Sequence, residues 1–516
     1  MIGSIERIAR LALRPTDRKG RKGSARPLWL SAFRGLVLAL WLVALFSQPL
    51  FAEMSVQEER ELSEKLLRQV IPQVRLVKDP EITSFVARIG RNILDVMGPR
   101  YFKYRFFVIE DDALNAFAMP GGLVFVHTGL IEAIDSENEL ACVLAHEFGH
   151  VRGRHMIRRV DNMKYVSIGT AIMALAGIFL GDAQATSAVI SSSLALGQSI
   201  ALKYSRADEQ EADRRALEWI CKAGYDPRGL ITTLEKMQRN QWFGSSSIPK
   251  YLSTHPAPEE RITYLEDYTK SHPCPERRKE NRFLLKKIQV KLHVMSSDPL
   301  QLVKEYKLKV VKSPKDPLAW YGYALSLSKA RRFGQAFEAF DKLFALARES
   351  VQFEPGHFEL DAASAYYEAG RYLEAVRLLE RYLAFHPEDD SAKFLMAKAL
   401  NEQGQSLEAI EYFKQIEPRW DDDPEFLFHY GRTLAAAGQK GKAHYYFFKY
   451  YGLIGDSRSA AYHKRRALAL LSPKSPLRRK MEGQSGPEES KGQEMGQEGQ
   501  PGGPGFSFRR DWQEVR

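Results

Sequence analysis

Residues 140–155 read LACVLAHEFGHVRGRH and place two histidines four residues apart in an otherwise apolar run. Four residues are about one helical turn, so His146 and His150 share one face of a helix. Two imidazoles on one face can bind one Zn²⁺, and the neighbouring carboxylate of Glu147 can take a proton from a water on the metal. The stretch therefore predicts a buried helix that carries a zinc site, with Glu147 as the general base.

A catalytic zinc ion of this kind needs a third protein ligand and an open position for water. Residues 204–227, YSRADEQEADRRALEWICKAGYDP, supply carboxylates on a second predicted helix. Glu209 and Asp213 lie one turn apart on one face. Glu209 is therefore the predicted third ligand, and Asp213 the predicted acceptor for the free N–H of a ligand histidine. Glu211 points elsewhere and is the weaker candidate, and a solvated charged face is the alternative if this helix stood alone.

The segments around these two helices predict an α+β domain. Residues 54–100 have apolar positions three and four residues apart, which indicates helices. Residues 101–110 and 123–128 are rich in β-branched and aromatic side chains, which indicates two strands. Ser136 and Glu139 form a capping-box pattern where the histidine helix begins. The domain is thus expected to be mainly helical, with a small β-sheet.

An internal repeat follows in residues 295–471. The segments AGRYLEA, QGQSLEA and AGQKGKA end at residues 375, 409 and 443, in steps of 34 residues. A period of this length, with Gly between two amphipathic helices, is the tetratricopeptide signature. Each unit leaves an apolar face that its neighbour covers, so the units are expected to stack into an α-helical superhelix with a concave surface.

The N-terminus is strongly basic. Residues 1–34 hold nine Lys/Arg and two Asp/Glu, so most of the formal net charge of +11 comes from this segment, and the rest of the chain shows no nucleic-acid-binding module. The apolar run GLVLALWLVALFSQPLFAE, residues 35–53, follows it. Together they predict a secretory signal cleaved after Ala52. An uncleaved anchor is the alternative, because the run is nearly long enough to span a bilayer.

Three further features are less specific. Residues 163–203 are apolar and rich in small residues, which indicates either a helical hairpin over the site or at a membrane surface, or two plain core helices. Cys142 is expected to pack as a small apolar residue, and Cys221 and Cys274 can pair after export. The predicted divisions are a signal or anchor (1–52), a metal-site domain (53–275), a repeat domain (276–472) and a disordered tail (473–516).

Several motifs together resemble the HtpX/BepA-like family of zinc metallopeptidases. They are HEFGH (146–150), SRADEQEAD (205–213), NAFAMPGG (115–122) and STHPAPEERI (253–262). The tetratricopeptide array is similar to that of the exported branch of this family, and the resemblance covers roughly residues 54–471. It implies a gluzincin-like fold, one Zn²⁺ per chain held by His146, His150 and Glu209, and quality control of outer-membrane or periplasmic proteins. It leaves the basic start, the apolar hairpin and the tail unexplained.

Three other histidines need an assignment. His255, in the His-Pro loop of STHPAPEERI, is expected near the zinc ion, mainly on the family resemblance. As a fourth ligand it would displace the water and restrain the enzyme, and as a hydrogen-bond donor it would stabilise the oxyanion. The alternative is a histidine that only anchors its loop. His127 and His155 are expected to be structural.

The combined prediction is an exported zinc endopeptidase of the periplasm. Its substrates are expected to be unfolded or misassembled proteins, bound as an added strand along the strand that includes Gly121, Gly122 and Val124. The repeats are expected to recruit substrates or the outer-membrane assembly machinery, with possible peripheral membrane contact and no nucleic acid. Two alternatives remain open: an exported tetratricopeptide chaperone or scaffold with a structural or vestigial metal site, and a membrane-anchored peptidase of the HtpX kind.

Overall fold

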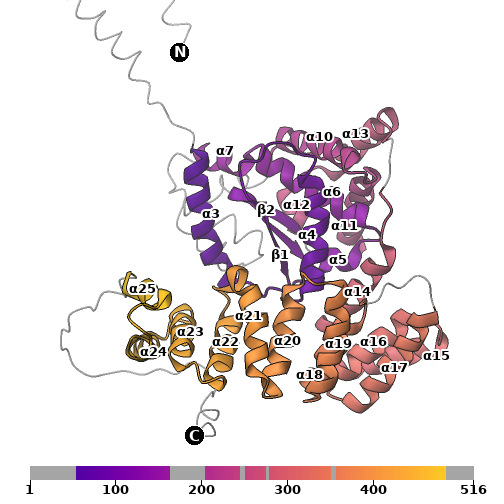
Figure 1. Cartoon of the computed structure of the whole chain (residues 1–516). Coiled ribbons are helices and arrows are strands. Elements are labelled where there is room, and N and C mark those ends of the chain that lie inside the picture. Colours follow the sequence, from indigo (N-terminus) through magenta and orange to yellow (C-terminus); the bar gives the residue numbers. More distant parts are fainter. Residues whose placement is uncertain (1–53, 163–203, 244–249, 275–277, 350–355, 484–516) are drawn as a thin grey trace, which may run out of the picture.

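The computed structural model describes residues 54–162, 204–243, 250–274, 278–349 and 356–483 (Figure 1). A domain that contains a small β-sheet comes first, and a curved array of paired helices, coloured salmon to yellow, lies against one side of it. The predicted signal or anchor and the apolar hairpin lie outside the described residues. No helix among the described residues is long and apolar enough to cross a membrane.

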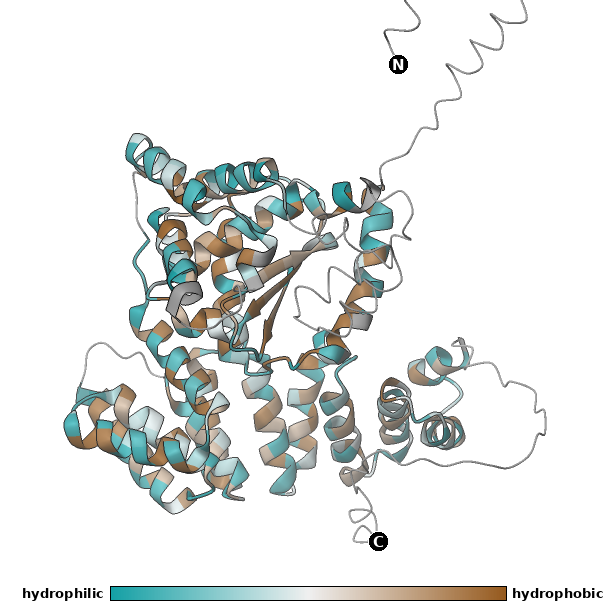
Figure 2. Cartoon of the chain, turned by 180° about the vertical axis from the view of Figure 1, so that it is seen from behind, coloured by the Kyte–Doolittle hydropathy of each residue, from teal (hydrophilic) through white to brown (hydrophobic). Residues whose placement is uncertain are grey.

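The sheet has three strands in the order β1-β3-β2. β1 (Arg105–Ile109) pairs in parallel with β3 (Leu123–His127), and β2 (Ala116–Met119) pairs antiparallel with the other side of β3. All residues of β2 and β3 are buried, and Figure 2 shows the strands in brown between helices with teal outer faces. The two predicted strands are therefore present, and β2 is a third strand that the sequence did not indicate.

The strand that was predicted to offer a free edge lies in the centre of the sheet. Val124 pairs with β1 on one side and with β2 on the other. Gly121 and Gly122 belong to the 3₁₀ turn η2 (Pro120–Gly122), which connects β2 to β3. The prediction of a substrate edge at these three residues is therefore wrong, because both sides of β3 are already paired. The edge strand next to the histidine helix is β2.

The histidine helix is α6 (Glu137–Arg152), and it runs through the centre of its domain. Ser136 caps it by accepting a hydrogen bond from the backbone N–H of Glu139, as predicted. Every residue from Leu140 to Val151 is buried, because α4, α10, α11 and β2 all contact this helix. The helices around it are α3 (Val56–Val70), α4 (Pro80–Leu94), α5 (Thr128–Ala133), α7 (His155–Asn162), α10 (Arg206–Lys222), α11 (Arg228–Phe243), α12 (Lys250–Thr254) and α13 (Pro258–Ser271), with the short η1 (Ile71–Gln73) after α3.

The cysteines are placed as the sequence suggested. A disulfide joins Cys221 at the end of α10 to Cys274 after α13, with their Cα atoms 5.2 Å apart. It fastens the second helix of the site to the segment that leads into the repeats. Cys142 is a free thiol buried in α6, where it packs in the apolar core.

The array consists of helix pairs that repeat along the chain, which fits the 34-residue period. Their apolar faces share one continuous core. The helices are α15 (Pro299–Lys312), α16 (Pro317–Lys329), α17 (Phe333–Glu349), α18 (Glu359–Glu368), α19 (Tyr372–Phe385), α20 (Asp390–Glu402), α21 (Ser406–Trp420), α22 (Pro424–Ala436), α23 (Lys440–Leu453), α24 (Ser457–Leu470) and α25 (Pro476–Gly483).

The last of these helices corrects one prediction. α25 lies within the tail that was expected to be disordered, yet Met481 is fully buried against the repeat core. The helix also approaches α24, and Arg478 donates hydrogen bonds to the backbone carbonyls of Leu468 and Leu471. Leu477 also packs against this core, but two apolar residues in a polar segment are too few to detect from composition. Residues 484–516 of the predicted tail lie outside the described residues.

Helix α14 (Arg282–Ser296) joins the two parts of the molecule. Leu285, Ile288 and Leu292 on one face pack in the core of the sheet-containing domain. The predicted boundary at residues 275 and 276 precedes this helix. Because α14 belongs to the core of the first domain and also contacts α16 of the array, the two parts are built on a shared helix.

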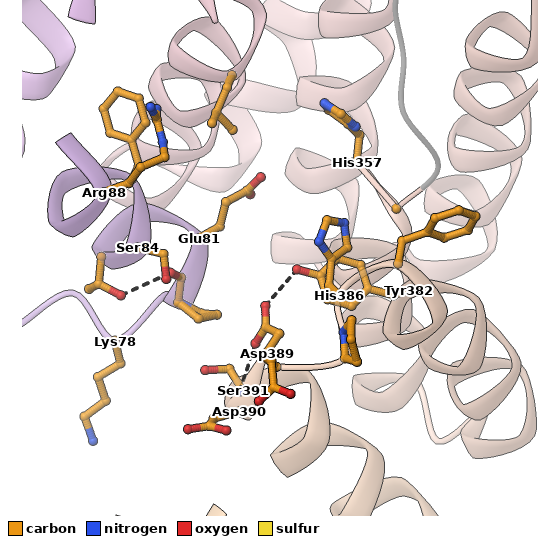
Figure 3. Close-up of a pocket in the computed structure, with 18 of the residues that line it drawn as sticks. Lys78, Glu81, Ser84, Arg88, His357, Tyr382, His386, Asp389, Asp390 and Ser391 are labelled. Carbon is orange, nitrogen blue, oxygen red and sulfur yellow. Dashed lines mark hydrogen bonds between the residues drawn. The ribbon is translucent and has the colours of Figure 1, made fainter. Parts of the chain in front are cut away.

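A cavity of about 840 Å³ lies between α4 and the repeats (Figure 3). Lys78 and Arg88 line it from the first domain, while Asp389 and Asp390 line it from the start of α20. Tyr382 stands in its wall and donates a 2.7 Å hydrogen bond to Asp389. The cavity therefore has a basic side and an acidic side, and it leaves the two parts of the molecule only partly in contact.

Candidate metal centre

Four buried side chains from separate segments converge on one point. His146 and His150 come from α6, Glu209 from the first turn of α10, and His255 from the chain just after α12. Nitrogen and oxygen atoms of these four side chains all lie within 4.8 Å of one another. The structure therefore brings together the three predicted zinc ligands and the histidine that was predicted to lie near them.

The short contacts in this cluster join atoms that bind metals. His146 Nε2 lies 2.9 Å from His150 Nε2 and 3.3 Å from His255 Nδ1. Glu209 Oε1 lies 3.0 Å from His255 Nδ1 and 3.4 Å from His150 Nε2. Imidazole nitrogens and a carboxylate that face one another at these distances fit a bound cation, and a set of nitrogen and oxygen donors suits Zn²⁺.

Burial and neighbouring charges shift the pKa values of these four groups. It lowers the pKa of His146 and of His255 to about 4, and that of His150 to about 3. Burial alone would raise the pKa of Glu209, but the neighbouring His255 and Arg261 outweigh it and hold that pKa well below its ordinary value. Metals bind neutral imidazoles and ionised carboxylates. At neutral pH the cluster is therefore in the form that binds a metal.

Glu147 lies beside the cluster, with its Oε1 3.7 Å from His255 Nε2. Its Oε2 accepts a 3.1 Å hydrogen bond from the backbone N–H of Ala118 in β2. Burial, followed by the charge of Glu209, raises the pKa of Glu147 well above its ordinary value. A carboxylate whose pKa is raised takes up a proton more readily than an ordinary carboxylate, which is what a general base must do.

Asp213 and Arg261 surround the ligands on the side away from the sheet. Asp213 Oδ1 lies 2.7 Å from His146 Nδ1, so it faces the nitrogen that a metal leaves free. Arg261 on α13 places Nη2 2.7 Å from Asp213 Oδ1 and Nη1 2.6 Å from Glu209 Oε2. Tyr264 on the same helix donates a hydrogen bond to Asp213. One buried arginine thus contacts both Glu209, the predicted ligand carboxylate, and Asp213, the carboxylate predicted to orient His146.

The second ligand histidine has its own support, which the sequence did not reveal. His150 Nδ1 lies 2.8 Å from Nδ1 of the buried His155, and His155 Nε2 lies 3.2 Å from Glu211 Oε2. The Tyr204 ring stacks on the His150 ring at a centroid distance of 3.8 Å. Glu211, the weaker ligand candidate, therefore does not reach the cluster itself. It contacts His155, and His155 contacts His150.

His255 is also held by an aromatic ring that sequence reasoning missed. Tyr251 on α12 stacks on it with ring centroids 4.3 Å apart and an interplanar angle of 16°. The four-residue spacing between Tyr251 and His255 was the available signal, since it places both on one side of a helical turn. His127 lies outside the cluster, at the end of β3, with its Nδ1 3.2 Å from Asp111.

Comparison with known proteins agrees with this geometry. Residues 80–269 match the model of peptidase family M48, and residues 360–424 match a tetratricopeptide-repeat model. The chain is 27% identical over 385 residues to the Beta-barrel assembly-enhancing protease of Escherichia coli strain K12, covering 67% of this chain and 77% of the relative. The corresponding protein of Yersinia pestis is also 27% identical, over 67% of this chain and 78% of its own length.

A eukaryotic relative matches the first domain. The mitochondrial metalloendopeptidase OMA1 of Schizosaccharomyces pombe is 29% identical over 221 residues, covering 42% of this chain and 63% of the relative. The bacterial relatives are named as proteases and the OMA1 relative as a metalloendopeptidase. The buried cluster of two histidines, a glutamate and a third histidine could hold the metal ion that a metalloendopeptidase needs. Residues 80–269 therefore form a zinc-dependent metallopeptidase domain similar to family M48, and tetratricopeptide repeats follow this domain.

Proposed function

We propose that this metallopeptidase is exported and degrades misfolded or stalled proteins of the periplasm and outer membrane. The basic and apolar N-terminal segments support export, and the printed name of the bacterial relatives links those proteins to the assembly of β-barrels. The repeats offer a second surface on which a substrate or a component of the assembly machinery can bind. Fractionation of cells, with alkaline extraction of the membranes, distinguishes a soluble periplasmic enzyme from a membrane-anchored one.

The observation that carries the proposal is the position of Glu147 between the metal ligands and the edge of the sheet. Ala118 directs its backbone N–H away from β3 and towards Glu147. Among the described residues, β2 has a strand neighbour on one side only. A substrate can therefore add to the free edge of β2 as a further strand, which brings its backbone to the metal ligands. Such binding depends on the backbone and suits unfolded chains of varied sequence.

Each residue of the site then has a proposed role. His146, His150 and Glu209 hold the zinc ion, and Asp213 fixes the orientation of His146 through its Nδ1. A bound Zn²⁺ polarises the peptide carbonyl and makes a water molecule more acidic. Glu147 takes the proton of that water on its carboxylate and passes it to the nitrogen of the leaving amine. A scaffold protein would need no such base.

Replacing Glu147 with Gln tests this role. Gln keeps the size of the side chain but cannot take the proton, so the variant is expected to retain its fold and zinc content while losing cleavage of an unfolded substrate such as casein. Glu218→Gln is the matched control, because Glu218 is an exposed carboxylate on α10 that pairs with Lys222 on the same helix. Cleavage by Glu147→Gln at the rate of the unaltered protein would show that the proposed base is wrong.

A further inference from the structure

We propose that helix α15 docks the repeat array on a membrane surface that contains anionic lipid. This helix is the first of the array and lies at its right-hand end in Figure 1. Its inner face is buried, because Leu302 and Tyr306 pack in one apolar cluster with Val294 of α14. The outer face of the same helix carries both apolar and basic side chains, and this combination is the basis of the proposal.

Three apolar side chains on the outer face of α15 are exposed to water. Leu300, Leu308 and Val311 are 65%, 71% and 72% exposed, and Leu407 is the only other large apolar side chain of the described residues that is exposed to this degree. A helix turns by about 100° per residue, which places the three within about 80° of one another around the axis of α15. They therefore form one stripe. Because a terminal helix of a repeat array normally has a polar outer face, the stripe indicates a binding surface.

Lysines lie within the stripe and on both sides of it. By the same helical geometry, Lys304 lies among the apolar residues, Lys307 flanks them on one side and Lys312 flanks them on the other. None of these three lysines has a carboxylate partner in the part of the chain that the structure describes, whereas Lys309 pairs with Glu305. The outer face of α15 therefore carries positive charge that is not compensated.

This charge favours one kind of partner. Uncompensated lysines repel a second copy of the same face and are attracted to an anionic surface. Carboxylates of an acidic protein could pair with the lysines but would not bury the apolar stripe, whereas a bilayer offers acyl chains beneath a layer of anionic headgroups. In a helix that lies flat in this interface, leucine and valine side chains enter the acyl boundary while lysine stems extend to the headgroups. With 14 residues, α15 is long enough to lie on a bilayer but too short to cross it.

A fluorescent label on the stripe tests the docking. Leu308→Cys supplies one accessible thiol, because Cys142 is buried and Cys221 and Cys274 form a disulfide. We expect the emission of a polarity-sensitive dye on this thiol to shift to the blue when the full chain is mixed with vesicles of equal parts phosphatidylcholine and phosphatidylglycerol. Vesicles of phosphatidylcholine alone are expected to give a much smaller shift. Because the dye reports only its own surroundings, vesicle binding by the basic N-terminal segment does not produce this signal.

Leu407→Cys is the matched control for position. Leu407 on α21 is 70% exposed, but the charged residues near it on that helix are Glu408 and Glu411. A dye at this position is expected to keep its emission unchanged with either kind of vesicle.

A second pair of variants tests the charge. Lys304→Gln with Lys307→Gln, made in the protein labelled at residue 308, is expected to raise the lipid concentration at half-maximal shift by roughly 25-fold, because each lysine near an anionic surface contributes about fivefold. Lys222→Gln with Lys414→Gln removes the same charge from two exposed lysines on other helices and is expected to change that concentration little.

Three outcomes would overturn the proposal. The first is a dye at residue 308 that keeps its emission unchanged with anionic vesicles, and the second is an equal shift from the dye at residue 407. The third is a shift at residue 308 with soluble polyglutamate but not with vesicles, which would assign the surface to an acidic protein. Because none of these measurements depends on cleavage of a substrate, each outcome leaves the proposed peptidase activity standing.

Discussion

Glu209 and Glu211 lie only two residues apart on α10, yet their surroundings assign them different roles. Glu209 has a side-chain exposure of 2% and faces the three histidines, while Glu211 is 29% exposed and contacts His155. The helical repeat separates the two side chains by more than half a turn. Two glutamates close together in the chain are therefore proposed to have different roles, Glu209 as a metal ligand and Glu211 as a support behind His155.

This difference predicts the zinc affinity of two variants. Glu209→Ala removes the only carboxylate of the four-residue cluster, so zinc affinity is expected to fall by far more than a hundredfold. Glu211→Ala only loosens His155 behind His150, and losses of about 10- to 100-fold are typical of such outer contacts. Titration with a zinc chelator measures both affinities. Equal affinities in the two variants would remove Glu209 from the ligand set.

His255 gives a prediction whose sign decides between two roles. Its Nδ1 lies 3.0 Å from Glu209 Oε1 and 3.3 Å from His146 Nε2, so it can serve as a fourth ligand and fill the position that water needs. We expect His255→Ala to raise cleavage, including self-cleavage, in an assay on purified zinc-loaded protein. A fall of about 10²–10³-fold would instead indicate an oxyanion donor. An unchanged rate would leave His255 as an anchor for its loop.

At the scale of elements, the sequence predicted helices better than it predicted strand order. The apolar pattern and the Ser136 cap indicated α6 correctly, because a helix is specified by residues close together in the chain. The run Leu123–His127 was recognised as a strand. A strand that is buried on both faces has the same apolar sequence whether it lies at an edge or in the centre of a sheet, so its place in the sheet could not be predicted. β2 has only four residues, too few to show a period.

The same reasoning explains which site residues could be found from the sequence. His146, Glu147 and His150 share one helical turn, so their spacing alone indicated a site. Arg261 contacts Glu209 and Asp213 across about fifty residues of chain, and only the packing of α13 against the site brings them together. Such long-range contacts leave no periodic signal in a single sequence.

The edge position of β2 predicts the effect of a proline. Ala118 donates its backbone N–H to Glu147 and not to β3, so Ala118→Pro removes no bond within the sheet, and proline is tolerated on edge strands. The variant is expected to fold and bind zinc but to lose most cleavage, because proline removes the N–H that contacts Glu147 and that a substrate strand at this edge would also need. Ala118→Gly retains the N–H and is expected to remain active. Circular dichroism, zinc content and casein cleavage measure the three properties. Full activity of Ala118→Pro would exclude the β2 edge as the substrate site.

At the scale of the whole molecule, a buried cluster of charges connects the peptidase domain to the repeats. Lys291 on α14 places its Nζ 2.5 Å from Asp361 on α18 and 2.6 Å from Asp79 at the start of α4. Lys287, one turn earlier, lies 2.6 Å from Glu81 and 3.4 Å from Asp361. Since α14 also contributes to the apolar core of the first domain, this cluster places ionic contacts between the two parts next to that core, and we propose that it holds the repeats against the peptidase domain.

Asp361 is the member of this cluster that the repeats supply to both lysines. Burial alone would raise its pKa, but Lys291 and Lys287 outweigh burial and lower that pKa to about 2, so the carboxylate is ionised at neutral pH. Asp361→Ala would leave the two buried lysines with Asp79 and Glu81 as their remaining carboxylate partners and so with less compensation of their charge. Removing one partner of a buried ion pair typically costs about 3–5 kcal/mol, whereas replacing both partners by apolar residues is often nearly neutral. The double variant Asp361→Leu with Lys291→Met is therefore expected to be more stable than Asp361→Ala.

Denaturant unfolding of the full chain measures these differences, and Asp390→Ala is the matched control within the same repeats. Asp390 pairs with Arg419, whose side chain is half exposed, and such surface pairs contribute only about 0–1 kcal/mol. We expect Asp361→Ala to lower the free energy of unfolding by several times the effect of Asp390→Ala. Cleavage of short peptides is expected to persist in Asp361→Ala under native conditions, because the metal ligands all lie outside the cluster. If the two aspartate variants are equally stable, the buried charges do not hold the repeats against the peptidase domain. The apolar faces of α14 and the array would then be sufficient to hold the two parts together.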